Sequence, residues 1–414
     1  MKKNNDDNDE KKGEFDFELI KENSSKIVIN KNNKKVDSFE ILSKDKEFCY
    51  ESEFIDLSFR YIYENNPLFK HVIFHINELL EKNKNSKDKE IIKILSNFIN
   101  NDEFSEEIIE KILLNGIPES LPCLRPLIWK SLIGFFPLKQ LSKWVDITNK
   151  KKSDYQKMID KYNYYPNNLI EPGDKYLLDQ ISKDIPRTRF DVPFFKEKNN
   201  DKEINYDIIK RILFFYSKEH KEVNYIQGMN EIIAIIFYIF SKDDNPFSKD
   251  FIESDAYFTF EKLMSEIKDI FLLDDINYSE LFVTFQIKEI KHILKKIDLE
   301  LLNYFKKIGL EIDNFVMRWI LVLFAQEFTI DVAVNFWDRL FTQKNKLKFI
   351  CYISVAIIKN NRENIMKMDA GEVMLWAQQL QKKMKEIDIS NIVKMALQIQ
   401  NSYKKKESNN IEIK

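Results

Sequence analysis

Hydrophobic residues recur with a helical period along most of this chain. In residues 208–216 the apolar positions fall at i, i+1, i+4, i+5 and i+8, which is the spacing of one helix face. Residues 229–240 are apolar on all sides and predict a buried central helix. Residues 315–324 and 332–341 show a similar pattern. Because alternating β-branched runs are few, we predict an all-α body from about residue 103 almost to the C-terminus.

The composition changes along the chain and suggests its domain boundaries. Residues 1–45 are rich in lysine, asparagine, aspartate and serine and poor in hydrophobic residues, which predicts disorder. Residues 46–104 carry helical patterns interrupted by Asn- and Pro-containing breaks, so we predict a helical N-terminal extension. The dense helical pattern that follows continues almost to the C-terminus, where we predict a tail of residues 405–414.

Charge and cysteine content narrow the class of protein. The 414 residues have a net charge of −2, which argues against a general nucleic-acid binder. The three cysteines are far apart and form no CxxC motif, which fits a reducing, cytoplasmic setting. The longest apolar runs, 232–240 and 349–358, are shorter than the ~20 residues of a membrane-spanning helix. We therefore expect membrane contact only indirectly, through a partner.

Glycine usage bears on nucleotide binding. Only seven glycines occur, and they form neither GxGxxG nor GxxxxGK[ST], the motifs whose clustered glycines close around phosphates. No spacing of His, Cys, Asp or Glu indicates a metal site. We therefore expect the chain to hold no cofactor or metal of its own, and any nucleotide and Mg²⁺ to arrive on another molecule.

Candidate chemistry is concentrated in two short segments. Residues 181–187 read Ile-Ser-Lys-Asp-Ile-Pro-Arg, and residues 225–231 read Tyr-Ile-Gln-Gly-Met-Asn-Glu. Only eight of the 65 cationic residues are arginine, two of them Arg187 and Arg189, so the planar five-donor guanidinium is favoured there. Arginine and glutamine delivered together are what a slow GTPase lacks. The alternative is a simple ion pair between Asp184 and Arg187, three residues apart.

Local patterns place both segments. Tyr176, Leu177, Leu178 and Ile181 predict the apolar face of a helix that starts after residue 174. Pro186 disfavours helical geometry at the preceding residue, so Arg187 is expected on a loop just past this helix. Asn224 is an expected N-cap of the turn that carries Gln227, at the mouth of the central apolar helix.

These segments resemble the two fingerprints of the TBC domain of Rab GTPase-activating proteins. The first, IxxDxxR, is matched by Ile181, Asp184 and Arg187, and the second, YxQG, by residues 225–228. Blocks in the expected order flank them: Gly116-Ile117-Pro118, Leu124-Arg125-Pro126, Trp129-Lys130, Phe315, Arg318-Trp319, Gln326-Glu327-Phe328 and Trp337-Asp338. The resemblance covers roughly residues 105–404. Within the family, the chain is similar to the subgroup that contains TBC domain family member thirteen.

The resemblance implies a fold of two helical subdomains and a mechanism with two fingers. Arg187 would contact the γ-phosphoryl group of GTP on a Rab, and Gln227 would align the attacking water. The implied supporting residues are Asp184, Tyr225, Gly228 and Asn230. Core structure is expected for Arg125, Trp129, Arg318, Trp319 and Trp337.

The resemblance also implies a partner and a setting. GTP and Mg²⁺ would be brought by the Rab, and the chain would complete its partner's active site. Its role would be the regulation of vesicle trafficking, from the cytoplasm and at endomembranes only through the Rab. The alternative is a non-catalytic all-α scaffold that binds a small GTPase without accelerating hydrolysis.

Overall fold

The computed structural model describes residues 40–41, 48–49, 66–72, 106–115, 117, 121–164, 172–199, 203–271, 282–380 and 388–411. The segments predicted as disordered (1–45) and as a helical extension (46–104) lie almost entirely outside these residues. The tail at 405–414 is described only through the end of the last helix, at Ile411.

The described chain is almost wholly helical, which confirms the all-α prediction. Its helices are α5 (Glu106–Asn115), α6 (Leu124–Leu132), α7 (Trp144–Lys161), α8 (Pro172–Asp184), α9 (Asn205–Glu219), α10 (Met229–Ser241), α11 (Ile252–Ile267), α12 (Phe282–Ile297), α13 (Leu299–Lys307), α14 (Asp313–Leu321), α15 (Ile330–Phe341), α16 (Lys346–Asn360), α17 (Arg362–Ile365), α18 (Ala370–Gln378) and α20 (Ile389–Ile411). Two small antiparallel hairpins pair β1 (Glu40–Ile41) with β2 (Phe48–Cys49) and β3 (Lys198–Asn199) with β4 (Glu203–Ile204). Short 3₁₀ turns span Leu141–Lys143, Ile185–Arg187, Pro193–Lys196, Ser248–Phe251 and Lys268–Phe271.

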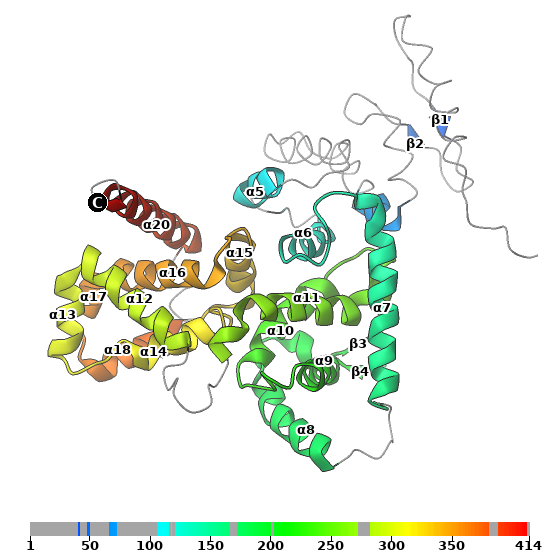
Figure 1. The fold of residues 1–414 in the computed structure, drawn as a ribbon, viewed down its shortest axis with the longest axis horizontal. Coiled ribbons are helices and arrows are strands. Elements are labelled where there is room, and N and C mark those ends of the chain that lie inside the picture. The colour runs from blue at the N-terminus through cyan, green and yellow to red at the C-terminus, as the bar shows by residue number, and fades with distance from the viewer. Residues whose placement is uncertain are drawn as a thin grey trace, which may run out of the picture.

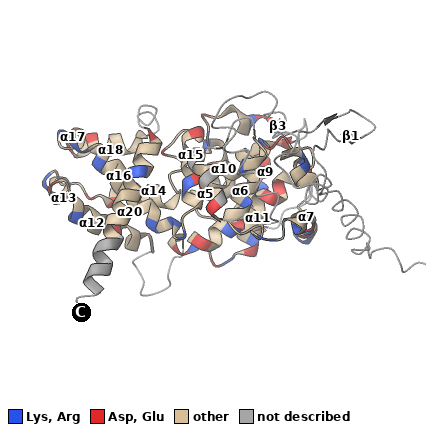
Figure 2. Cartoon of the chain, turned by 90° about the horizontal axis from the view of Figure 1, so that it is seen from above, with Lys and Arg blue, Asp and Glu red and all other residues tan. Residues whose placement is uncertain are grey.

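The helices form two subdomains that meet at α10 and α15 (Figure 1). Helices α7 to α11 pack together on one side, and α12 to α14, α16 to α18 and α20 pack on the other. Among the described helices, none is both long and apolar enough to cross a membrane. Figure 2 shows lysine and arginine interspersed with aspartate and glutamate over the helices, which is the pattern of a solvated surface.

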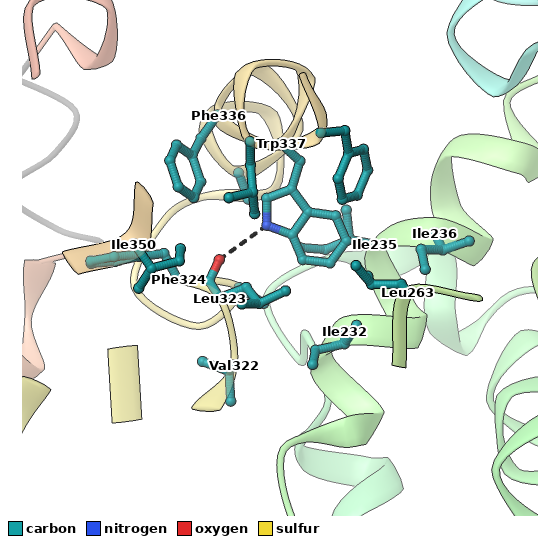
Figure 3. Close-up of a cluster of buried hydrophobic side chains, with 14 of the residues drawn as sticks. Ile232, Ile235, Ile236, Leu263, Val322, Leu323, Phe324, Phe336, Trp337 and Ile350 are labelled. Carbon is teal, nitrogen blue, oxygen red and sulfur yellow. Dashed lines mark hydrogen bonds between the residues drawn. The ribbon is translucent and has the colours of Figure 1, made fainter. Parts of the chain in front are cut away.

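Helix α10 forms the centre of the packing, as its sequence predicts. Its residues are buried from Met229 to Phe237, because α6, α9, α11 and α15 pack against it. Figure 3 shows Ile232 and Ile235 of α10 beside Trp337 of α15, whose indole Nε1 donates to the carbonyl of Leu323 at 3.0 Å. The two subdomains therefore share one hydrophobic core.

The apolar run 315–324 does not continue as one helix. Helix α14 ends at Leu321, and Leu323 and Phe324 take positive φ angles of 48° and 60°. The chain there forms the 322–329 loop, which connects α14 to α15. Burial of these side chains compensates for the left-handed backbone, because both are fully enclosed in the core. Hydrophobic pattern alone does not reveal such a helix end.

Ion pairs join helix α6 to α11 and α15. Lys130 Nζ donates to Asp255 Oδ2 on α11 at 2.7 Å. Arg125 Nε donates to Asp338 Oδ1 on α15 at 3.2 Å, and Trp129 Nε1 donates to the same oxygen at 2.8 Å. A buried carboxylate is tolerated only with such partners, so these contacts fix how α6 sits on the domain.

Candidate functional site

The segment that carries Arg187 leaves the end of α8 in a tight turn. Helix α8 ends at Asp184, and the 3₁₀ turn Ile185–Arg187 includes Pro186, as the sequence predicts. The Thr188 hydroxyl donates to the main-chain carbonyl of Asp184 at 3.0 Å, which closes the turn. Ile185 is buried while Arg187 is exposed. We call residues 185–192 the arginine segment.

The segment that carries Gln227 is a turn between α9 and α10. Asn224 has a positive φ of 58°, and its side-chain oxygen accepts from the Tyr225 amide at 2.8 Å. Gly228 has φ 112°, and a Cβ there would lie 3.0 Å from Val322 Cγ1, so only glycine fits without strain. Gly228 occupies the N-cap position of α10, and Gln227 is exposed just before it. We call residues 224–228 the glutamine turn.

Hydrogen bonds tie the arginine segment directly to the glutamine turn. The Tyr225 hydroxyl donates to Asp184 Oδ2 at 2.7 Å. The Asn230 amide Nδ2 donates to Thr188 Oγ1 at 2.8 Å, and Asn230 Oδ1 accepts from the Gly228 amide at 3.0 Å. Burial, and then the hydrogen bond to Asp184, raise the pKa of Tyr225, which keeps its hydroxyl protonated as a donor.

Arg187 and Gln227 open onto one cleft of about 690 Å³, which we call the α8–α9 cleft. It is lined by Gly173, Tyr176, Leu177, Gln180, Lys183, Asp184, Arg187, Ser217, Lys218, Lys221, Asn224, Tyr225 and Gln227. The side chains of Arg187 and Gln227 make no hydrogen bond or ion pair with another described residue. Both side chains are therefore available to a group that enters from outside.

The α8–α9 cleft is predominantly basic. Lys183 and Lys221 are exposed on its wall beside Arg187, while Lys218 donates to Asp174 Oδ1 at 2.5 Å. Asp184, the acid in the lining, accepts from Tyr225. A cleft of this charge attracts anions such as phosphates. Across the described ranges, no group of three or more His, Cys, Asp or Glu side chains could hold a metal ion.

The structure brings together all six residues singled out from the sequence. It also corrects what was expected of some neighbouring residues. Asp184, Arg187, Tyr225 and Gln227 line the cleft, with Gly228 and Asn230 directly behind it. Helix α8 begins at Pro172, three residues earlier than expected. Tyr176 was expected on the apolar face of α8. It is instead 70% exposed, because it lines the cleft.

The structure also differs from two further expectations about single residues. Asn224 was expected to be the N-cap of the turn that carries Gln227; its side chain accepts from the next amide, Tyr225, and its φ is positive, while Gly228 occupies the N-cap position of α10. Arg318 is not a core residue, since its side chain is 43% exposed and its Nε donates to the buried Glu327 at 2.6 Å. Trp129, Trp319 and Trp337 are fully buried and Arg125 is partly buried, as expected.

Sequence reasoning named Arg189 only for its guanidinium and did not reveal which buried residues support the site. Arg189 and Glu231 are 3% and 2% exposed, yet their positions beside the two fingerprints suggest surface residues. Tyr206 donates to the Thr188 carbonyl at 2.7 Å and so holds the arginine segment from α9. Burial raises the pKa of Glu231 to about 7, although Gln326 donates to its carboxylate. A buried charge pattern of this kind has no signature in a single sequence.

Comparisons with known proteins agree with this fold. The model of the Rab-GTPase-TBC domain family matches residues 122–366. TBC1 domain family member 13 of Homo sapiens is 33% identical over 172 residues, covering 41% of this chain and 42% of that protein. GTPase-activating protein gyp1 of Schizosaccharomyces pombe is 22% identical over 285 residues, covering 65% and 52%. The matches thus span about half the length of these relatives.

A solved structure shows the same architecture. The crystal structure of the Ypt/Rab-GAP domain of Gyp1p superposes with a TM-score of 0.65 at 24% identity. It covers 76% of this chain and 99% of that domain. At this identity the likeness establishes the fold.

Proposed function

This chain belongs to the Rab-GTPase-TBC domain family, and on that premise we propose that it is a GTPase-activating protein for a Rab-family small GTPase. It would act by supplying Arg187 and Gln227 in trans to the partner's nucleotide site. One observation carries the proposal: the side chains of Arg187 and Gln227 both line one basic cleft, where they are exposed and have no partner among the described residues.

Arg187 would act on the transferring phosphoryl group. Negative charge grows on its oxygens in the transition state, and a guanidinium aimed at them lowers the barrier. A finger supplied in trans increases turnover by roughly 10³–10⁵-fold. The exposed position of Arg187 just past the end of a rigid helix, on a closed turn, suits a group that must enter another protein's site.

Gln227 would orient the attacking water. Its carboxamide oxygen can accept a hydrogen bond from the water while its NH₂ group donates one to the γ-phosphoryl group. Residues on both sides of it are fixed, because Tyr225, two positions before, is hydrogen-bonded to Asp184, and Gly228, directly after, is hydrogen-bonded to Asn230. The turn therefore positions the glutamine through its neighbours rather than through contacts of the glutamine itself.

The nucleotide and its Mg²⁺ would arrive with the GTPase. Phosphate-cradling glycine motifs are absent from the sequence, which supports a chain that completes a partner's active site. As a regulator of a Rab, it would act in vesicle trafficking from the cytoplasm and reach endomembranes through that Rab.

The test is GTP hydrolysis by a panel of purified Rab-family GTPases with the wild-type chain, Arg187→Ala and Gln227→Ala at equal concentration. We expect acceleration on one or a few GTPases that is lost in both variants, while their unfolding curves match the wild type. Acceleration that persists in Arg187→Ala would contradict the arginine role. Binding to a GTPase without acceleration on any panel member would instead indicate a non-catalytic scaffold.

A further inference from the structure

Arg189 points in the opposite direction from Arg187, although only one residue separates them. Arg187 is exposed, whereas the side chain of Arg189 is 2% exposed. The backbone of Arg189 has a φ of 42°, a left-handed conformation that non-glycine residues rarely adopt. Such a backbone persists only where surrounding contacts hold it, so the contacts of this guanidinium indicate its role.

The guanidinium of Arg189 reaches across the seam between the two subdomains. Its Nη1 donates to the carbonyl of Phe328 at 3.0 Å and also to the carbonyl of Ala325. Both acceptors belong to the 322–329 loop of the second subdomain. Its Nη2 lies 3.9 Å from Asp191 Oδ2, within the arginine segment itself. Arg189 therefore binds the arginine segment to the 322–329 loop.

The same loop also supports the glutamine turn. A Cβ at Gly228 would lie 3.0 Å from Val322 Cγ1, so the turn already rests closely on the loop. Gln326 Nε2 donates to Glu231 Oε1 at 3.2 Å, in the first turn of α10. One loop thus contacts the supports of both fingers.

The loop is itself fixed within the second subdomain. Arg318 Nε donates to Glu327 Oε1 at 2.6 Å, and Trp337 Nε1 donates to the Leu323 carbonyl at 3.0 Å. Leu323, Phe324 and Phe328 are fully buried. A support held on this many sides can fix the relative position of two segments that rest on it.

From these contacts we infer that Arg189 is a positioning residue, which sets the place of Arg187 relative to Gln227 through the 322–329 loop. The inference rests on the proposed function, because it concerns the geometry of the two fingers. Both carbonyls accept from Nη1 of Arg189, which the planar guanidinium holds in place, whereas a lysine has one ammonium on a flexible stem. Small displacements of a catalytic group cost much of the rate, so a loosened arginine segment lowers turnover without removing a finger.

The test compares Arg189→Met and Arg189→Lys with the wild type on the most responsive GTPase. We expect kcat to fall by about tenfold to a hundredfold in Arg189→Met, with an unchanged KM for the GTPase and an intermediate fall in Arg189→Lys. Arg125→Lys serves as the control, since Arg125 is a partly buried arginine of α6 that bonds Asp338 of α15, away from the cleft. It should keep the wild-type kcat.

Binding measurements separate positioning from a general structural role. The probes are the GTPase loaded with GDP and aluminium fluoride, which mimics the transition state, and the same GTPase loaded with a non-hydrolysable GTP analogue. Arg189→Met should lose about tenfold in affinity for the first probe and keep its affinity for the second. Equal losses on both probes, a wild-type kcat in Arg189→Met, or the same kcat loss in Arg125→Lys would overturn the inference.

Amide hydrogen exchange tests the same inference without a GTPase. The amide of Thr188 donates to the Asp184 carbonyl at 3.1 Å, and that of Val192 donates to the Arg189 carbonyl at 2.9 Å. In Arg189→Met both should exchange faster, while protection in α10 stays at the wild-type level. Unchanged protection at both amides would overturn the inference. If no GTPase responds to the wild type while both amides lose protection, the proposed function fails and the anchoring of the segment by Arg189 stands.

Discussion

At the level of single residues, the hydroxyl of Tyr225 is the most direct link between the glutamine turn and the end of α8. Tyr225→Phe removes its hydrogen bond to Asp184 and keeps the ring. The free energy of unfolding should fall by about 1 kcal/mol, and kcat of GTPase activation by about tenfold because the turn is loosened. Denaturant unfolding and GTP hydrolysis measure the two effects.

The matched control for Tyr225→Phe is Tyr304→Phe. The Tyr304 hydroxyl donates to the carbonyl of Met368 at 2.9 Å, within the second subdomain. This variant should lose a similar free energy of unfolding and retain the wild-type kcat. If both variants activate GTP hydrolysis equally, the Tyr225 hydroxyl serves stability alone.

Gly228 tests how closely the glutamine turn rests on the 322–329 loop. Gly228→Ala adds a methyl group at φ 112° against Val322 Cγ1 at 3.0 Å, so the free energy of unfolding should fall by about 2 kcal/mol. Gly309→Ala has a similar positive φ of 71° but open space around it and should cost about 1 kcal/mol. Combining Gly228→Ala with Val322→Ala should recover part of the loss in denaturant unfolding; no recovery would mean that backbone strain dominates.

At the level of elements, the first turn of α10 carries a buried acid whose ionisation opposes folding. Burial raises the pKa of Glu231 from 4.5 to about 7. Between these pH values the folded state binds more protons than the unfolded state, so stability falls as the pH rises from about 4.5 to 7. Glu231→Gln keeps the acceptor for Gln326 and removes the titration. Relative to this variant, the wild type should lose up to about 3 kcal/mol between pH 4.5 and pH 8.

Denaturant unfolding at several pH values measures that difference. Glu363→Gln, an exposed acid on α17, controls for the loss of one charge and should run parallel to the wild type. Parallel curves for Glu231→Gln and the wild type would show that Glu231 ionises in the folded state at its ordinary pKa.

The sequence predicted helix positions correctly where the hydrophobic pattern is compatible with only one kind of structure. The all-apolar run 229–240 became α10, and the helix before Pro186 ended where the proline requires. The run 315–324 failed because burial alone does not show whether a chain is helical; Leu323 and Phe324 are buried in a left-handed loop. Tyr176 failed because an aromatic ring at helical spacing serves equally as core or as cleft wall.

The candidate site was predictable in its members but not in its supports. Sequence fingerprints located Arg187 and Gln227, and the structure places both on one cleft. The partners of Asn230 and Arg189 lie 42 and up to 139 residues away along the chain. Such pairs depend on how the subdomains pack, which one sequence does not encode in any local pattern.

At the level of the whole molecule, the candidate site belongs to both subdomains even though both finger residues come from the first. The arginine segment and the glutamine turn each rest on the 322–329 loop, which belongs to the second. That loop is anchored to the shared core by Trp337. The packing of the subdomains at α10 and α15 therefore determines the geometry of the cleft (Figure 1).

The distribution of charge over the molecule leads to a prediction about association with the GTPase. The chain has a net charge of −2, yet Lys183, Arg187 and Lys221 gather on the α8–α9 cleft. A local basic field speeds the encounter with an anionic partner surface and its bound nucleotide, and salt screens it over about 10 Å at 0.1 M. Lys183→Glu and Lys221→Glu should therefore raise KM by about tenfold at low salt, with kcat unchanged.

Salt dependence distinguishes this steering from a specific contact. The KM of the wild type should rise with salt and approach that of the two variants, because screening removes the advantage of the lysines. Lys150→Glu makes the same charge change at an exposed position on α7, outside the cleft lining, and should leave KM near the wild-type value. A KM difference that persists at high salt would assign the lysines to direct contacts with the partner, and an equal effect of Lys150→Glu would attribute it to net charge alone.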